Sequence, residues 1–171
     1  IWRWMLDSDF GVVTHVLNAL GLVPDGQTPL GEPSSAMVSV IIANVWHGFP
    51  FAMLIYWAAL QTIDSSQYEA ARVDGANALQ QFRFVTLPGL RNATIALLVL
   101  RGIWTLTYFD LIYLITGGGP AGATTTWPIW IYHEAIGRSR FGFASAIAIV
   151  LAFAMFALVL WYVRRMRTPE R

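Results

Sequence analysis

The chain has 171 residues, of which 56% are hydrophobic and 12% are charged, and its formal net charge is +1. The charged fraction is about half of that in soluble proteins and the apolar residues come in long blocks, which excludes an ordinary soluble domain. The nearly balanced charge gives no indication of nucleic-acid binding, and the lack of cysteine excludes disulfides and thiolate metal sites.

The N-terminal segment, residues 1–35, mixes apolar with turn-forming residues and predicts no membrane span. A short helix over 11–22 would suit the membrane surface, with Trp2 and Trp4 at the interface. The chain begins at Ile1, without an initiator methionine or the charged start of a signal peptide, which predicts that an N-terminal part lies outside this sequence.

The first predicted transmembrane helix covers 36–60, which carries no Asp, Glu or Arg and exceeds the ~20 residues needed to cross the hydrocarbon core. Pro50 inside it predicts a kink, because proline frees a carbonyl one turn earlier. This makes Pro50 a candidate hinge for gating, although a purely structural role is an alternative. Asn44 shares a face with Gly48 and Phe51, and could hydrogen-bond to a solute or to another helix.

Residues 61–91 are too polar to span a membrane and are predicted to form two short helices. Ser66 and Glu69 have the spacing of a capping box, and Gly75 would end the first helix in a left-handed conformation. The second helix, over 76–84, should stop before Pro88 because proline disfavours helical geometry in the preceding residue. Two interpretations stay open for this segment: docking to a soluble protein, or lying on the lipid headgroups.

The second predicted span, 92–115, is apolar except for Arg101 and Asp110. A charged side chain in mid-membrane costs ~2.5–3.5 kcal/mol on insertion scales, so Arg101 should face a partner or a water-filled path. On a helical wheel, Thr94, Thr105 and Tyr108 share its face. One interpretation makes this face a wall of the solute pathway, with Trp104 and Tyr108 stacking on a sugar ring. In the alternative, Arg101 binds helix carbonyls or an acid of a partner subunit.

A loop over 116–141 precedes the third predicted span, 142–163, and a tail over 164–171 follows it. Four-residue spacing of Ala144, Ala148 and Ala152 would allow another helix to approach closely. Arginines are more frequent on the side of 61–91 and of the tail than on the other side, which places these two segments in the cytoplasm. The cytoplasmic arginines are Arg72, Arg83, Arg91, Arg164, Arg165, Arg167 and Arg171, against Arg3, Arg138 and Arg140 outside.

The segment 61–91 resembles the EAA motif of bacterial ABC-importer permeases. That motif reads E-A-A, three residues, G, nine residues, I, one residue, L-P, and the chain matches its spacing with Glu69-Ala70-Ala71, Gly75, Val85 in place of isoleucine, and Leu87-Pro88. The variant E-A-A-R-V-D-G-A resembles the carbohydrate-uptake branch, which is related to maltose and glycerol-3-phosphate permeases. Two further stretches are similar to that branch, W-H-G-F-P-F from Trp46 and F-D…T-G-G-G-P from Phe109 to Pro120.

The resemblance implies an all-α integral membrane fold: about three transmembrane helices and a cytoplasmic two-helix coupling segment, as the C-terminal portion of an about six-helix permease. In that family the coupling helices sit in a cleft of the ATPase subunit. The residues carried over to ATPase docking are Glu69, Ala70, Ala71, Asp74, Gly75, Ala76, Phe82, Leu87 and Pro88. The candidate substrate pathway comprises Asn44, Trp104, Thr105 and Tyr108.

The implied function is that of a permease subunit of a binding-protein-dependent importer for a sugar or related carbohydrate. The implied partners are an ABC ATPase dimer that holds ATP and Mg, a second permease chain, an extracytoplasmic solute-binding protein and the bilayer of a bacterial or archaeal cytoplasmic membrane. The chain itself has no phosphate loop, catalytic constellation or metal-ligand spacing, so no cofactor or enzymatic activity of its own is expected. The alternative is a scaffold subunit that docks a cytoplasmic partner without moving a solute.

Overall fold

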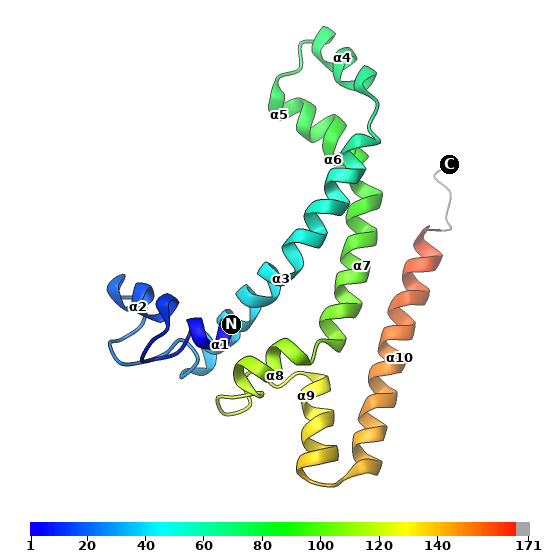
Figure 1. Ribbon diagram of the computed structural model, residues 1–171. Helices are drawn as coiled ribbons and strands as arrows, with labels where there is room; N and C mark the ends of the chain where they lie inside the picture. Colours follow the sequence, from blue (N-terminus) through cyan, green and yellow to red (C-terminus); the bar gives the residue numbers. More distant parts are fainter. Residues whose placement is uncertain (167–171) are drawn as a thin grey trace. The chain divides into compact units, whose positions relative to one another are not determined.

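The computed structural model describes residues 1–166, and every regular element in that part of the chain is a helix (Figure 1). The predicted all-α fold class is therefore confirmed. Two arginines of the orientation count, Arg167 and Arg171, lie outside the described residues. The chain divides into two compact units: one contains Ile1–His47 and the chain from Ile103 onward, and the other is Gly48–Gly102.

Two helices are long and apolar enough to cross a membrane, α3 (Pro33–Gln61) and the Phe141–Tyr162 part of α10 (Phe141–Met166). A third span results if Ala78–Gly89 and α7 (Arg91–Thr107) count as one helix, which is bent by 59°. Pro50 lies inside α3 without ending it. This agrees with the ability of membrane helices to accommodate proline.

The predicted continuous helix over 92–115 is wrong. The chain leaves helical structure at Tyr108 and Phe109 and starts a new helix, α8 (Asp110–Thr116). The Thr107 hydroxyl donates back to the carbonyls of Ile103 and Trp104 at the end of α7, and Asp110 places its negative charge in the first turn of α8. The Thr107 bonds favour a break because a threonine hydroxyl that binds backbone carbonyls often bends a helix. The Asp110 charge favours a new start because a carboxylate stabilises a helix N-terminus. The polarity of Asp110 thus marks a helix start and not a charge within a span.

The first unit is built around a small apolar core. Val40 and Ala43 of α3 meet Ile112 and Ile115 of α8 and Ile129 of α9 (Trp127–Tyr132). Trp2 of α1 (Trp2–Met5) packs against this core, whereas Trp4 is exposed. A helix is present within 11–22 as predicted, α2 (Val12–Ala19), and its position at the membrane surface stays a prediction.

The segment 116–141 is more ordered than the predicted loop. It contains α9 and a π-helical turn, η2 (His133–Gly137). The chain then reverses into α10, which packs along α9. The buried residues of α10 are Ala144, Ile147 and Leu151, spaced by three and four residues. The close approach predicted at the three alanines therefore holds only in part, because the buried face follows this spacing. Ala144 is buried, Ala148 is half-buried and Ala152 is exposed.

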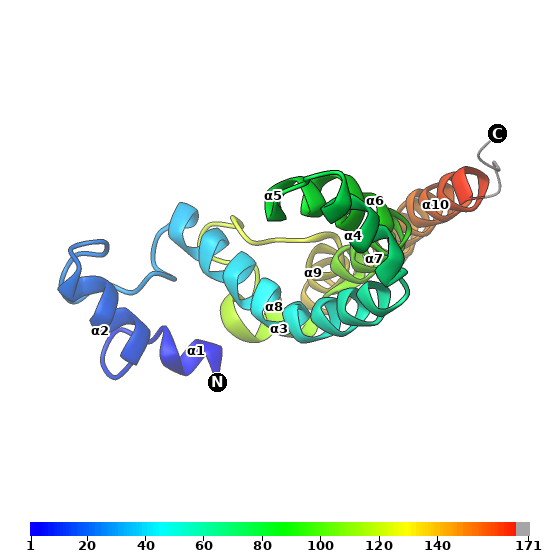
Figure 2. The same cartoon turned by 90° about the horizontal axis from the view of Figure 1, so that it is seen from above.

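The second unit carries the polar segment. The chain runs along the end of α3, turns through α4 (Ser65–Val73) and α5 (Ala78–Gln81), and returns into α7 (Figures 1 and 2). Between α5 and α7 lie a π-helical turn, η1 (Phe82–Thr86), and a single helical turn, α6 (Leu87–Gly89). We call the part of this unit from Ile63 to Gly89 the lobe.

Candidate functional site

The first helix of the lobe starts on Asp64. Its backbone is extended (φ −63°, ψ 129°), and its carboxylate accepts a hydrogen bond from the Ser66 N–H at 2.9 Å. This backbone hydrogen bond, followed by one from the Ser66 side chain, lowers the pKa of the Asp64 carboxyl. The predicted capping box of Ser66 and Glu69 is wrong, because Asp64 already occupies the capping position and Ser66 lies inside the helix. Glu69 is consequently left exposed on the helix surface.

The first helix ends as predicted, in a left-handed glycine. Gly75 has φ +79°, and its N–H donates to the Arg72 carbonyl at 3.0 Å. The next N–H, of Ala76, reaches the Ala71 carbonyl at 2.9 Å. These two bonds define a Schellman motif, which also brings the side chains at the two ends of the longer bond together. The alanines at 71 and 76, both half-buried, therefore close the turn.

The second helix differs from the prediction at both ends. It starts one residue after Asn77, and a capping box joins Asn77 with Gln80 through two bonds of 3.0 and 2.8 Å. Helical structure then continues through Pro88 instead of stopping before it. Just before the proline, the Leu87 N–H donates to the Phe82 carbonyl, a π-helical bond. The wider turn accommodates a residue that lacks an N–H, so helical geometry persists at Leu87 (φ −64°, ψ −44°).

Long-range contacts hold the lobe closed. The Tyr68 and Thr86 hydroxyls lie 2.9 Å apart and join α4 to η1. At the base, Ile63 packs on Gly89 so closely that a Cβ on this glycine would lie 2.7 Å from the Ile63 Cδ1. The lobe is thus a folded unit with a fixed outer surface and not a loose linker.

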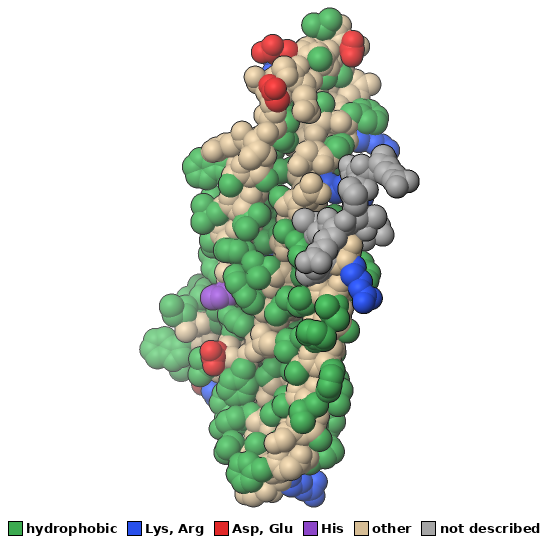
Figure 3. Space-filling model, turned by 90° about the vertical axis from the view of Figure 1, so that its right-hand side faces the viewer, with side chains coloured by type: hydrophobic (Ala, Val, Ile, Leu, Met, Phe, Trp, Pro, Cys, Tyr) green, Lys and Arg blue, Asp and Glu red, His purple; other side chains and the backbone are tan. Residues whose placement is uncertain are grey.

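The outer surface of the lobe combines acidic and apolar side chains. Glu69, Ala70, Asp74 and Gly75 are exposed, and Figure 3 shows acidic side chains gathered near this end of the unit. Five large apolar side chains of the lobe are also exposed: Val73 (88%), Leu79 (75%), Phe82 (50%), Phe84 (69%) and Leu87 (54%). Several large exposed apolar side chains on one small unit are typical of an interaction surface.

The predicted docking residues all belong to the lobe. Pro88 is exposed like most of them, and only Ala71 and Ala76 are half-buried. Sequence reasoning missed Val73 and Leu79 as part of this surface. The sequence did indicate them, since a large apolar residue on a short polar helix is expected to contact another surface.

The predicted pathway residues belong to the first unit and are only partly brought together. Tyr108 lies in the break after α7, with its ring centroid 5.5 Å from that of His47 on α3. The helical-wheel prediction that Tyr108 shares a face with Thr94 and Thr105 is therefore wrong, because α7 ends before Tyr108. Asn44 is half-buried on α3. Trp104 and Thr105 are exposed near the end of α7.

Arg101 is directed toward α3. Its guanidinium lies against Gly48, so that a Cβ added at this glycine would overlap the guanidinium group. Gly48 is buried and Arg101 is half-buried. The glycine on the face of Asn44 and Phe51 thus makes room for a charge between two helices. The Thr94 hydroxyl proton is not available on this face, since it is donated to the Leu90 carbonyl at 2.9 Å.

Comparison with known proteins gives a consistent picture. A family model described as the inner membrane component of binding-protein-dependent transport systems matches residues 12–168. The trehalose/maltose transport system permease of Thermococcus litoralis is 37% identical over 163 residues, covering 95% of this chain and 54% of that protein. The sulfoquinovosyl glycerol transport system permease of Agrobacterium fabrum is 35% identical over 170 residues, covering 99% of this chain and 54% of that protein.

A solved structure resembles the whole chain. A crystal structure of a bacterial ABC transporter that imports the acidic polysaccharide alginate superimposes with a TM-score of 0.82 and 29% sequence identity, covering 98% of this chain and 59% of the matched chain. A second structure, of a bacterial alginate ABC transporter with a pentasaccharide-bound periplasmic protein, gives a TM-score of 0.81 at 28% identity. The chain spans about half the length of the curated relatives it matches.

Proposed function

Because the chain belongs to the family of inner membrane components of binding-protein-dependent transport systems, we propose that it is part of a permease subunit that imports a carbohydrate by coupling to a partner ATPase. The chain is a membrane protein. The transport activity rests on the relatives, whose names specify trehalose or maltose, sulfoquinovosyl glycerol and alginate. A sugar or related solute is therefore the proposed cargo.

The lobe is the proposed docking site for the ATPase, and its exposed surface is the observation that supports the proposal. An ATPase that docks on rigid helices can transmit its own closure to the membrane helices, whereas a loose linker would absorb the movement. Tyr68 and Thr86, together with Ile63 on Gly89, give the lobe that rigidity. Glu69 has no partner in residues 1–166, so its carboxylate is available to a basic group of the ATPase. ATP and Mg would be held by that partner.

The solute would pass beside the helix break after α7. Tyr108 and Trp104 offer aromatic faces on which a sugar ring can stack, and Asn44 and Thr105 offer hydrogen-bonding groups. The proposed hinge at Pro50 is supported by the boundary between the two units, which falls at His47 and Gly48 on α3 and at Gly102 on α7. No atom lies within 4 Å of a Cβ placed on Gly102, so neighbouring side chains do not lock this position.

The orientation proposed from the arginine count places the lobe and the C-terminus in the cytoplasm. The residues 1–35 and 116–141 then face outward, where a solute-binding protein would dock. A second permease chain would complete the pathway. The solved complex of a bacterial alginate ABC transporter with a pentasaccharide-bound periplasmic protein supports the proposed docking of a solute-binding protein.

Reversing the charge of Glu69 tests the docking proposal. In the full-length permease expressed with its ATPase, Glu69→Arg should strongly reduce the ATPase that co-purifies, while the amount of permease in the membrane stays the same. Glu32→Arg is the matched control, because Glu32 is also exposed and lies outside the lobe. Equal ATPase recovery with wild type and Glu69→Arg would refute the docking site.

A further inference from the structure

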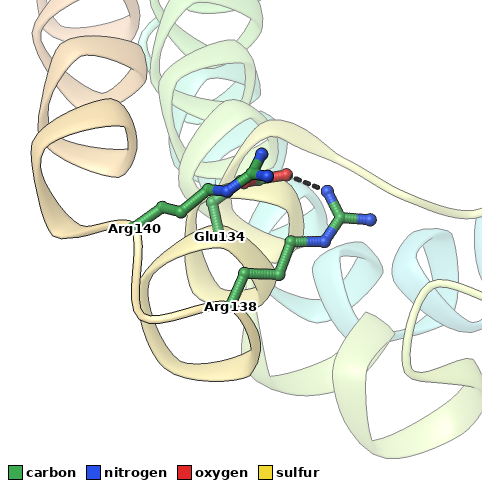
Figure 4. A network of polar contacts seen from close by, with 3 residues as sticks. All are labelled: Glu134, Arg138 and Arg140. Carbon is green, nitrogen blue, oxygen red and sulfur yellow. Dashed lines mark hydrogen bonds and ion pairs between the residues drawn. The ribbon is translucent and has the colours of Figure 1, made fainter.

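The corner between η2 and α10 holds a charge cluster to which the proposed function assigns no role. Glu134 is 2% exposed, and its carboxylate is bound by two arginines that are mostly exposed, Arg138 (62%) and Arg140 (65%) (Figure 4). Arg138 donates a hydrogen bond to Oε1. Arg140 makes a longer ion pair, with its guanidinium nitrogen 3.7 Å from Oε2. The cluster is therefore held by one buried acid and carries one positive charge in excess.

The depth of this corner follows from the helix that begins there. The apolar span of α10 starts at Phe141, the residue after Arg140. The side chains around the corner are exposed and apolar: Ile136 (60%), Phe141 (60%) and Phe143 (49%). Trp130 lies beside Phe143 with ring centroids 6.0 Å apart, and tryptophan is typical of the membrane interface. In Figure 3, basic side chains gather at the lower end of a largely hydrophobic face.

From this placement we propose that Arg138 and Arg140 bind the phosphate of an anionic phospholipid, whose acyl chains cover the apolar side chains of the corner. Arginine forms paired hydrogen bonds to phosphate, and each guanidinium has donors that no described residue of the chain occupies. Glu134 acts as a positioning residue. It fixes Arg138 at one carboxylate oxygen and draws Arg140 toward the other, so that both cations converge at headgroup depth.

The backbone of Glu134 also contributes to the corner. The Glu134 carbonyl accepts the Arg140 N–H at 2.8 Å, which ties the start of α10 to η2. Both the backbone and the side chain of Glu134 thus hold the corner. A lipid headgroup would meet a preformed pair of cations and would not need to order two flexible side chains.

The test measures lipid retention by the full-length chain. The purified protein is exposed to equal amounts of phosphatidylglycerol and phosphatidylcholine, and the bound lipids are counted by native mass spectrometry. Wild type should retain phosphatidylglycerol preferentially, and Arg140→Gln should lower that preference about fivefold, the factor expected for one basic residue at an anionic surface. This variant keeps the hydrogen-bonded pair of Arg138 and Glu134, so the corner should stay folded. Arg72→Gln, an exposed arginine of the lobe, is the control and should retain the wild-type preference.

Three results would overturn the proposal. The first is equal retention by wild type and Arg140→Gln, and the second is retention of phosphatidylcholine as readily as phosphatidylglycerol. The third is displacement of the lipid by millimolar inorganic phosphate, which would assign the cluster to a free anion. If Arg140→Gln instead weakened binding of the solute-binding protein and left lipid retention unchanged, the surface would belong to that partner.

Discussion

Replacing Gly75 perturbs the turn of the lobe without touching any side chain around it. No atom lies within 4 Å of a Cβ at this position, so Gly75→Ala adds no steric overlap and its cost comes from the backbone alone. At φ +79° that cost is about 1 kcal/mol, which lowers the population of the native turn about fivefold relative to open forms. Gly75→Pro is more severe, because proline fixes φ near −65° and removes the N–H that donates to Arg72.

Two measurements follow the turn and its consequence. Amide exchange of Ala76, whose N–H binds the Ala71 carbonyl, should be about fivefold faster in Gly75→Ala and should lose its protection in Gly75→Pro. Solute uptake per permease in the membrane should fall in the same order. Gly26→Ala is the matched control, since Gly26 also has a positive φ (+75°) and open space around a Cβ, but lies in the other unit. It should carry a similar local cost and leave the amide exchange of Ala76 unchanged.

The result for Gly75→Pro decides the interpretation. Wild-type uptake together with a disrupted turn would show that the lobe surface does not transmit ATP hydrolysis. Wild-type protection of Ala76 would refute the conformational reasoning itself. Equally fast exchange of Ala76 in Gly26→Ala would show that the effect reflects general destabilisation.

Two further predictions concern the ends of the lobe. Because hydrogen bonds from Ser66 lower the pKa of Asp64 below its ordinary value of 3.8, Asp64 stabilises the start of α4 above that value, and this contribution is lost as the pH falls through the lowered pKa. Exchange of the Ser66 amide, corrected for its intrinsic rate, should accelerate at acidic pH in wild type. It should not accelerate in Asp64→Asn, because asparagine keeps a capping oxygen that does not titrate. Identical pH profiles of the Ser66 exchange in wild type and Asp64→Asn would contradict this prediction. Gly89→Ala should lower the thermal stability because its Cβ would lie 2.7 Å from Ile63, and Ile63→Ala in the same chain should recover part of the loss. Gly142→Ala is the control, because no atom lies within 4 Å of a Cβ at this position. Equal thermal stability of Gly89→Ala and Gly142→Ala would exclude the proposed packing of Ile63 on Gly89.

Arg101 illustrates how the fold explains a second residue, Gly48, whose role the sequence leaves open. A lone arginine in an apolar stretch predicts a partner, a water-filled path or both, and the sequence offers no choice between them. In the structure its guanidinium faces Gly48 on α3, where only a residue without a Cβ leaves room. The glycine is therefore explained by the arginine, although 53 positions separate them in the chain.

Local chemistry made the first part of the lobe predictable from the sequence. A left-handed turn needs a glycine, and the bonds around Gly75 involve residues within five positions of each other. The apolar blocks of α3 and α10 likewise predict their helices, because a long run without charge has few alternatives. Where the local signals competed, the prediction failed: Asp64 displaced Ser66 as the cap, and a π-helical turn carried the helix past Pro88.

Tertiary contacts decided the features that depend on distant residues. The bond between Tyr68 and Thr86 closes the lobe, and the helix break at Tyr108 places this ring beside His47. The two arginines that bind Glu134 follow it by only four and six residues, but the 2% exposure of its side chain depends on the packing of the corner. The amino-acid sequence by itself thus determined the helices, their local ends and the family motif, since each depends on neighbouring residues. Which side chains share a surface was decided only by the packing of segments that are far apart in the chain.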